Sequence, residues 1–177
     1  MSDMLPFPLN KTSTQAANVD FLGKIFTVGG RSYRLVKNSA TMTAPKFKPI
    51  TYSYVTGGAS VTWATVKIAS ATTGQTQVAG ICVVTTTGNV TAGSYFFVQR
   101  TGDAQVLFGT TVAANEAVGT GAVTTYVGCA ASQPLAAGVS VAGLANHLLC
   151  FGRALVAVSA ADLTSGTAQL VRLEGII

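Results

Sequence analysis

The sequence predicts an all-β protein, either a sandwich or a barrel of about nine to ten short strands, with an extended N-terminal arm. Short apolar or alternating stretches recur along the chain, and glycine-containing turns separate them. The 177 residues are enough to bury one hydrophobic core. Helical candidates are confined to two short stretches, residues 144–149 and 159–163.

Residues 1–22 are predicted to form the arm, and residues 23–177 the β-rich domain. Pro6 and Pro8 exclude a helix here, because each proline fixes its own φ and restricts the residue before it. The apolar side chains of the arm need a partner, and they are Met4, Leu5, Phe7 and Leu9. They pack either on their own domain or on a neighbouring chain. If they dock on a neighbour, removing the first twenty residues weakens attachment and leaves the domain folded.

The strands are predicted from apolar alternation and from the turns between them. Gly29-Gly30, Thr56-Gly57-Gly58 and Thr101-Gly102-Asp103 are each predicted to be the loop of a hairpin. The continuously apolar stretch 78–86 predicts a central strand that is buried on both faces. The full set is 24–28, 31–36, 50–55, 60–68, 78–86, 94–100, 104–108, 122–129, 148–157 and 167–173.

Charged residues make up only 10% of the chain, and they are distributed unevenly. No acid lies between Asp20 and Asp103. That interval contains the bases Lys24, Arg31, Arg34, Lys37, Lys46, Lys48, Lys67 and Arg100. A basic stretch in a mildly acidic remainder favours electrostatic recognition of a partner or of another copy. The bases form no dense run and accompany no nucleic-acid-binding motif, so direct contact with nucleic acid is not expected.

The residues that enzymes need are scarce, so we expect no enzyme, no cofactor and no metal site. His147 is the single histidine, and it lies three residues before Cys150 with no second pair of ligands nearby. The six acids include no close pair for general acid–base catalysis. Cys82, Cys129 and Cys150 are predicted to be free thiols in a reducing compartment. An enzyme of unrecognised type would require a pocket that joins His147 to an acid.

Neither a secretion signal nor a membrane segment is expected. Asp3, Pro6 and Pro8 interrupt any apolar core of a signal peptide. The apolar stretch 135–151 is rich in Gly, Ser and Val, so it is predicted to be buried strand and loop. Tyr33, Tyr52, Tyr54 and Trp63 are spaced as expected for a core face or for cross-strand pairs.

Five segments resemble a pattern found in decoration (cement) proteins of tailed-phage capsids. The longest is residues 93–106, with the sequence GSYFFVQRTGDAQV, and residues 111–119 (TVAANEAVG) follow it. Residues 29–38 (GGRSYRLVKN) resemble an early strand of that family. The segments 152–155 and 171–173 resemble its last hairpin. The resemblance covers most of residues 23–177 in outline, and glycine-rich hairpins also occur in fibre and tail proteins.

The resemblance implies a structural role on the virion, at the capsid exterior, for a protein made in the host cytoplasm. The implied partner is the major capsid protein, bound between subunits of the assembled head and thereby stabilising it. A homo-oligomer is also implied, with a trimer favoured over a dimer. The expected partner-binding residues are the apolar residues of the arm and the basic residues Arg31, Arg34, Lys37, Lys46 and Lys48.

Other functions remain open at this stage. The main alternative is a phage fibre, spike or tail structural module that binds a host-surface glycan. Aromatic side chains in an exposed groove favour it, and burial of Trp63 and Tyr95 opposes it. A minor capsid or tail-tube component would share the β architecture and would form rings.

Overall fold

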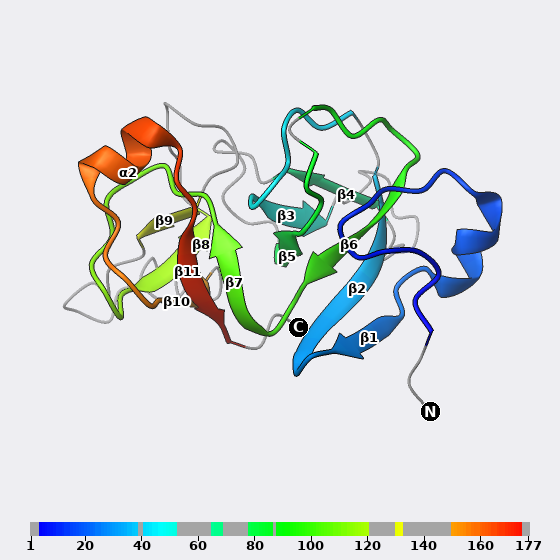
Figure 1. Cartoon of the computed structure of the whole chain (residues 1–177), viewed down its shortest axis with the longest axis horizontal. Coiled ribbons are helices and arrows are strands. Elements are labelled where there is room, and N and C mark those ends of the chain that lie inside the picture. Colours follow the sequence, from blue (N-terminus) through cyan, green and yellow to red (C-terminus); the bar gives the residue numbers. More distant parts are fainter. Residues whose placement is uncertain are drawn as a thin grey trace, which may run out of the picture.

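The protein is all-β and contains two sheets that lie side by side (Figure 1). The computed structural model describes residues 4–38, 41–52, 65–68, 78–86, 88–120, 130–132 and 150–174. These residues form eleven strands, one short α-helix and one 3-10 helix. The predicted fold class is therefore confirmed, with a barrel in one half of the molecule and an open sheet in the other.

The first sheet closes on itself. Its strands are β1 (Ile25–Val28), β2 (Arg31–Asn38), β3 (Pro49–Tyr52), β4 (Thr65–Ile68), β5 (Val78–Cys82) and β6 (Tyr95–Gln99). Strand β2 pairs with β4 in parallel and with β6 antiparallel, so β2, β4, β3, β5 and β6 form a five-stranded ring. Strand β1 lies outside the ring and pairs with β2 across the predicted Gly29-Gly30 turn.

The barrel is filled by one cluster of apolar side chains. The cluster comprises Val36, Met42, Ile50, Tyr52, Ala79, Cys82, Val84, Val90, Phe96 and Val98. A second cluster lies on the outer face of β1, β2 and β6, and it comprises Phe26, Tyr33, Leu35, Tyr95 and Phe97. Alternating residues of β6 contribute to the two clusters, as the two-residue period of a strand requires.

The N-terminal arm packs on the outer face of its own barrel. Leu5, Phe7 and Leu9 lie against the second cluster, and the Phe7 and Phe97 ring centroids are 5.0 Å apart. Ser13 exchanges two backbone hydrogen bonds with Tyr95, at 2.9 and 2.7 Å. The 3-10 helix η1 (Ala16–Phe21) then returns the chain to β1. Because this arm covers apolar surface, we now expect truncation of the first twenty residues to destabilise the domain.

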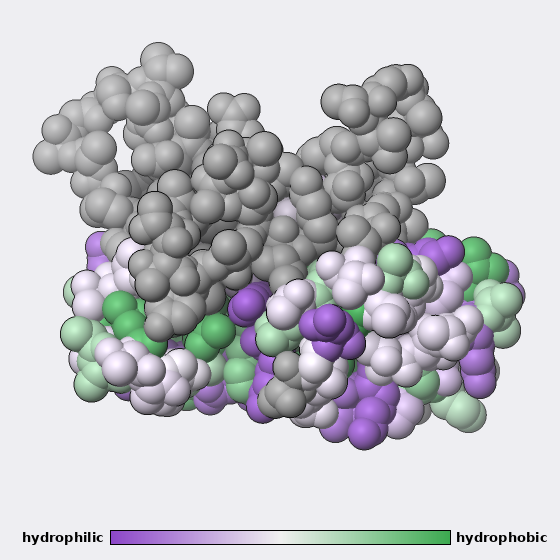
Figure 2. Space-filling model, turned by 90° about the horizontal axis from the view of Figure 1, so that it is seen from above, coloured by the Kyte–Doolittle hydropathy of each residue, from purple (hydrophilic) through white to green (hydrophobic). Residues whose placement is uncertain are grey.

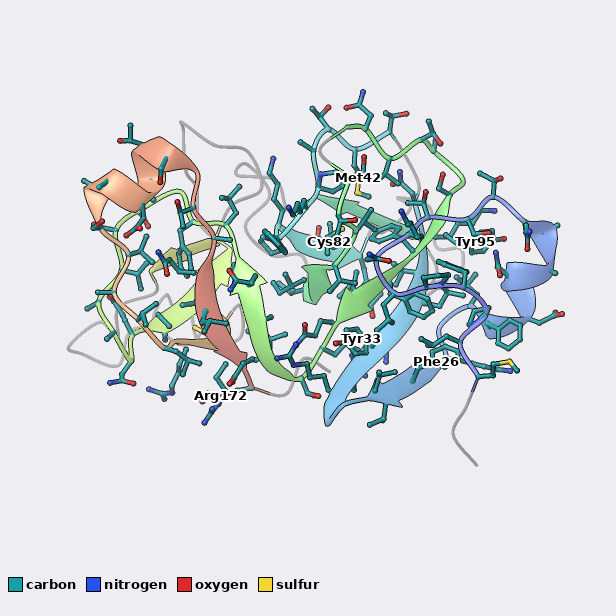
Figure 3. All side chains as sticks on the ribbon, in the orientation of Figure 1. Phe26, Tyr33, Met42, Cys82, Tyr95 and Arg172 are labelled. Carbon is teal, nitrogen blue, oxygen red and sulfur yellow. The ribbon has the colours of Figure 1, made fainter. Side chains whose placement is uncertain are left out.

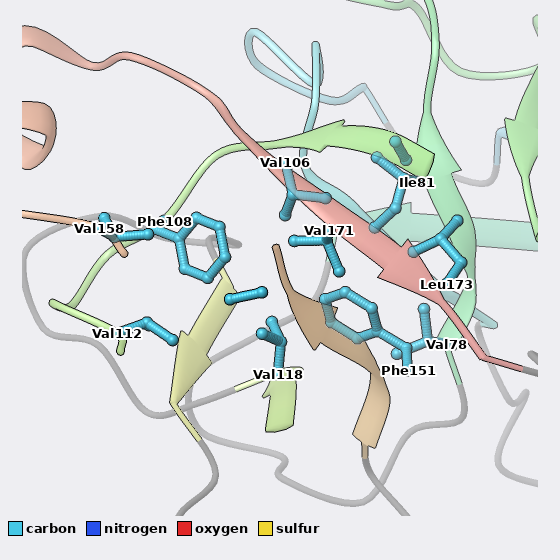
Figure 4. Packing of buried hydrophobic residues seen from close by; sticks show 12 residues of the cluster. Val78, Ile81, Val106, Phe108, Val112, Val118, Phe151, Val158, Val171 and Leu173 are labelled. Atoms are coloured by element: carbon cyan, nitrogen blue, oxygen red, sulfur yellow. The ribbon is translucent and has the colours of Figure 1, made fainter. Parts of the chain in front are cut away.

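The second sheet is open and antiparallel. Its order is β7 (Gly102–Val106), β11 (Gln169–Leu173), β10 (Cys150–Ala154), β8 (Ala117–Thr120) and β9 (Ala130–Ser132). Its core gathers Val106, Phe108, Phe151 and Val171, and Ile81 of the barrel joins them (Figure 4). The predicted helical turn at 159–163 is helix α2 (Ala160–Ser165), which Ser159 and Asp162 close with a capping box.

The predicted hairpin across residues 101–103 is wrong. Strand β6 pairs with β2 and β5, whereas β7 pairs with β11, so the turn carries the chain from the barrel to the second sheet. Gly102 has a φ of +81°, and an added Cβ would lie 2.9 Å from the Arg31 Cγ. Strand β6 pairs over five residues with β2, and β7 pairs over five residues with β11. These long-range pairings replace the hairpin that the local turn sequence predicts.

Other sequence predictions are confirmed in part. Strand β3 pairs antiparallel with β4, and β10 pairs with β11. Strand β5 is central and wholly buried, but it ends at Cys82 instead of residue 86. The predicted strand 122–129 and the helical candidate 144–149 lie outside the described residues.

Replacing Gly152 with alanine is expected to destabilise the second sheet. A Cβ at Gly152 would lie 2.3 Å from the backbone oxygen of Arg172, on the paired strand β11. Overpacking of this kind costs roughly 1–3 kcal/mol of unfolding free energy, measured by urea denaturation. The control is Gly88→Ala, whose nearest contact would be an ordinary 3.5 Å. Equal stability of the two variants would contradict the described β10–β11 register.

Candidate functional site

A cleft of about 380 Å³ separates the barrel from the second sheet. The barrel contributes Tyr33, Phe47 and Ile81, and the second sheet contributes Gln105 and Leu170. The arm forms a further wall with Leu9 and Asn10. The cleft thus combines apolar side chains with amide and hydroxyl groups, a combination typical of small-molecule sites.

Two hydrogen bonds join the barrel half of the molecule to β7 and to the residue that follows it, beside this cleft. The Gln99 Nε2 amide donates to the Asp103 carbonyl at 3.1 Å, and the Leu107 amide donates to the Phe47 carbonyl at 2.8 Å. Gln99 also donates to the Thr101 carbonyl at 3.0 Å. Because they anchor residues on either side of Gln105, these bonds fix the spacing between the two sheets there.

Phe47 has an unusual backbone conformation at the cleft. Its φ is +61°, a region that bulky residues rarely adopt. The Phe47 amide donates to the Cys82 carbonyl at 3.1 Å, and its own carbonyl accepts from Leu107. Bonds to both sheets therefore hold this residue in place. Such strain is concentrated at binding sites and other functional positions in proteins.

Opposite charges lie at the rim of the cleft. The Arg172 Nε donates to the Asp103 Oδ1 at 2.9 Å across the β7–β11 pair. This hydrogen bond is the main reason that the pKa of Asp103 lies below its ordinary value, and the charges of Arg172 and Arg31 lower it further. The stem of Arg31 lies over Gly102, which places Arg31 beside the cleft.

The arm residues predicted to bind a partner fall into two groups. Leu5, Phe7 and Leu9 are partly buried against the barrel. Met4 is 85% exposed, and with Phe21 and Ile25 it lines a shallow second pocket. Only Met4 among these four therefore presents most of its side chain to a partner.

The predicted basic residues do not all share one face of the barrel. Arg31 is exposed at the start of β2, and Lys37 extends over the Tyr95 ring at 5.4 Å. Arg34 donates to the Tyr52 hydroxyl, whose ring belongs to the barrel interior. Lys46 lies over the Phe47 ring at 4.8 Å, and Lys48 is partly buried nearby. In the view of Figure 2, hydrophilic residues lie mainly over the barrel half.

The thiols of the described residues are poorly placed for chemistry. Cys82 lies inside the barrel (Figure 3), and burial raises the pKa of its thiol to about 12. Cys150 is partly buried, and burial also raises the pKa of its thiol. Within the described ranges, no three His, Cys, Asp or Glu side chains gather closely enough to hold a metal ion. His147 and Cys129 lie outside those ranges.

Some other features from the sequence can be placed. Tyr33, Tyr52 and Tyr95 are all buried, as core positions on strands predict. Trp63 and Tyr54 lie outside the described residues, as does most of the apolar stretch 135–151. None of the helices described in the structure is both long and apolar enough to cross a membrane.

Sequence reasoning did not identify the cleft. The spacing of Tyr33 predicts a core face or a cross-strand pair. Nothing in the local sequence indicates that Phe47, Gln99 and Gln105 lie near Tyr33 in the folded protein. Gly102 is the one local sign of a turn near the cleft. The sequence predicts a hairpin there, whereas the structure places the glycine in the turn between the two sheets.

Comparisons with known proteins give a weak structural likeness. No protein-family model matches the chain, and no curated protein matches it. Among solved structures, the chain is similar to the N-terminal base of the head fibre protein gp8.5 of bacteriophage phi29. The two are 13% identical with a TM-score of 0.40, and the match covers 80% of this chain and 92% of that one.

The Asp103–Arg172 pair is expected to contribute to stability only above acidic pH. Because the folded-state pKa of Asp103 is lowered, its contribution is present above the unfolded pKa and is lost as pH falls through the folded value. Asp103→Asn should therefore lower the melting temperature at about pH 7 and have little effect near about pH 2. Arg172→Gln should lower the melting temperature in the same pH-dependent way. The melting temperature of the double variant should match that of either single variant. An equal loss at both pH values would contradict this assignment.

Cys82 is expected to resist alkylation in the folded protein. The thiolate is the reactive species, and burial keeps the Cys82 thiol protonated. Pulsed iodoacetamide labelling followed by peptide mass spectrometry should modify Cys150 first and Cys82 only in denaturant. Labelling of Cys82 as fast as Cys150 in the native protein would contradict its position inside the barrel.

Proposed function

We propose that this protein is a non-enzymatic phage structural protein that decorates the capsid. It binds the outer surface of an assembled head between subunits of the major capsid protein and stabilises the lattice. Binding to the assembled shell alone stabilises that shell by mass action. Contacts of one particle with several subunits add avidity.

The observation that carries the proposal is the separation of charge between the two halves of the molecule. Residues 21–102, which include the whole barrel, contain eight bases and no acid. In the second sheet, Arg153 pairs with Glu174 and Arg172 pairs with Asp103. A basic barrel beside a mildly acidic second half suits a protein that orients one half toward an acidic partner surface.

Two further features support the same role. The chain has only 10% charged residues, and a surface so poor in charge gives weak protection against association. The segments that resemble capsid decoration proteins also supply strands to both sheets, since residues 93–106 contain β6 and β7. We propose a homo-oligomer, with a trimer favoured over a dimer, located on the virion exterior.

The main alternative is a fibre or spike module that binds a host glycan. It would be favoured by aromatic rings in an exposed groove. Tyr95 is only 5% exposed, which opposes a stacking platform at that position. Phe47 does line the cleft between the two sheets, and an aromatic ring at that position favours sugar binding there.

The proposal is tested by binding to purified, expanded heads of the parent phage. The protein should co-sediment with the heads, raise their melting temperature, and dissociate as salt increases. Lys46→Glu should weaken binding roughly three- to tenfold because it reverses a charge on the barrel. Lys11→Glu makes the same exchange in the arm and should bind nearly as well as the parent protein. Failure of the protein to co-sediment with the heads at low salt would overturn the proposal.

A further inference from the structure

The cleft between the two sheets contains a strand edge that the fold leaves open. Gln105 of β7 lies opposite Leu170 of β11. The Leu170 carbonyl accepts from Leu155, on the β10 side, so Leu170 directs its backbone groups away from β7. In an antiparallel pair the residue opposite does the same. The N–H and C=O of Gln105 therefore point to the free edge of β7.

That free edge faces the cleft, and Gln105 is the position on it whose donor and acceptor are both available. On one side of Gln105, the Asp103 carbonyl is occupied by the Gln99 side chain. On the other side, the Leu107 amide is occupied by the Phe47 carbonyl. No hydrogen bond joins the Gln105 backbone groups to another group of the described residues. One donor and one acceptor thus remain side by side within the cleft.

A tyrosine hydroxyl opens into the same cleft. Tyr33 is 6% exposed and lines the cleft from β2, the barrel strand that begins beside β7. Figure 3 places it on the side of the barrel toward the second sheet. In the described part of the chain, no hydrogen bond satisfies its hydroxyl. Because this oxygen is reachable from the cleft although most of the ring is buried, it can donate to or accept from a ligand there.

The remaining lining completes the chemistry of the cleft. Phe47 and Ile81 provide apolar surface near the open edge. Asn10, Arg31 and the Gln105 side chain provide donors and acceptors around the opening. Phe47 is also held in its strained conformation by bonds to both sheets. The volume of about 380 Å³ lies within the range of small-ligand sites.

We propose that this cleft binds an N-acetylated sugar. The acetamido group supplies one N–H and one C=O for the Gln105 edge, and its methyl group contacts the apolar surface. The sugar hydroxyls suit the Tyr33 hydroxyl and the amide and guanidinium groups. An extended peptide fits less well, because strand addition needs bonds at alternate residues and the Asp103 carbonyl and the Leu107 amide are already occupied. The site shares Leu9 and Arg31 with the residues expected to contact the capsid, but the two contacts are measured with different ligands, so either can fail alone.

The test is an NMR titration of the ¹⁵N-labelled full chain with N,N′-diacetylchitobiose. The sugar should shift the Gln105 amide resonance saturably, whereas cellobiose, which has hydroxyls in place of the acetamido groups, should bind far more weakly. Tyr33→Phe should raise the Kd roughly three- to tenfold because it removes one hydrogen bond. Tyr95→Phe removes a hydroxyl from the same barrel face, outside the cleft, and should leave the Kd unchanged.

A second pair of variants tests the strand edge. Gln105→Pro removes a backbone N–H that the β7–β11 ladder does not use, and an edge strand tolerates proline at such a position. Binding should be lost in Gln105→Pro and largely kept in Gln105→Ala. The proposal is overturned if cellobiose binds equally well, or if Tyr33→Phe has no effect. It is also overturned if no saturable shift occurs by about 10 mM sugar, or if N-acetylalanine N-methylamide binds more tightly than the disaccharide.

Discussion

Strand β2 is the element on which both the barrel and its outer covering depend. One of its edges pairs first with β1 and then, near its end, with β4, while its other edge pairs with β6. Because β4 and β6 are linked to each other through β3 and β5, their pairing with β2 closes the sheet into a ring. Ring closure also fixes which face of β2 points into the barrel. Val36 lies inside the barrel, and Leu35 lies on the outer face under the arm. A one-residue slip of β2 would exchange these faces.

The junction between the two sheets follows from that closure. Once β6 is held in the ring, the chain must leave it at Gly102, and β7 starts a separate sheet beside the barrel. Gln99 and Phe47 bridge the gap through hydrogen bonds to β7. The cleft therefore lies where a closed barrel joins an open sheet, and both these two bonds and the packing of Ile81 in the core of the second sheet hold the halves together there.

The same division separates the electrostatic properties of the molecule. The uninterrupted basic interval folds into the barrel, whereas the arginines of the second sheet are paired with acids on their own or a neighbouring strand. A molecule built this way presents two different surfaces from one chain. The capsid contact that we propose uses the basic half, and the proposed sugar site uses the seam between the halves.

The sequence alone determined the strand character, the Gly29-Gly30 hairpin, the short helix near residues 159–163 and the basic interval. These features depend on local alternation, turn chemistry and composition, which can be read over a few residues. Only the tertiary structure decided that the arm packs on its own barrel and that β6 and β7 belong to different sheets. It also decided that Tyr33 and Gln105 line the same cleft. Those outcomes depend on pairing between residues far apart in the chain. The Thr101-Gly102-Asp103 turn is compatible with either a hairpin or a crossing, and the long-range partners of its two strands determine which one forms.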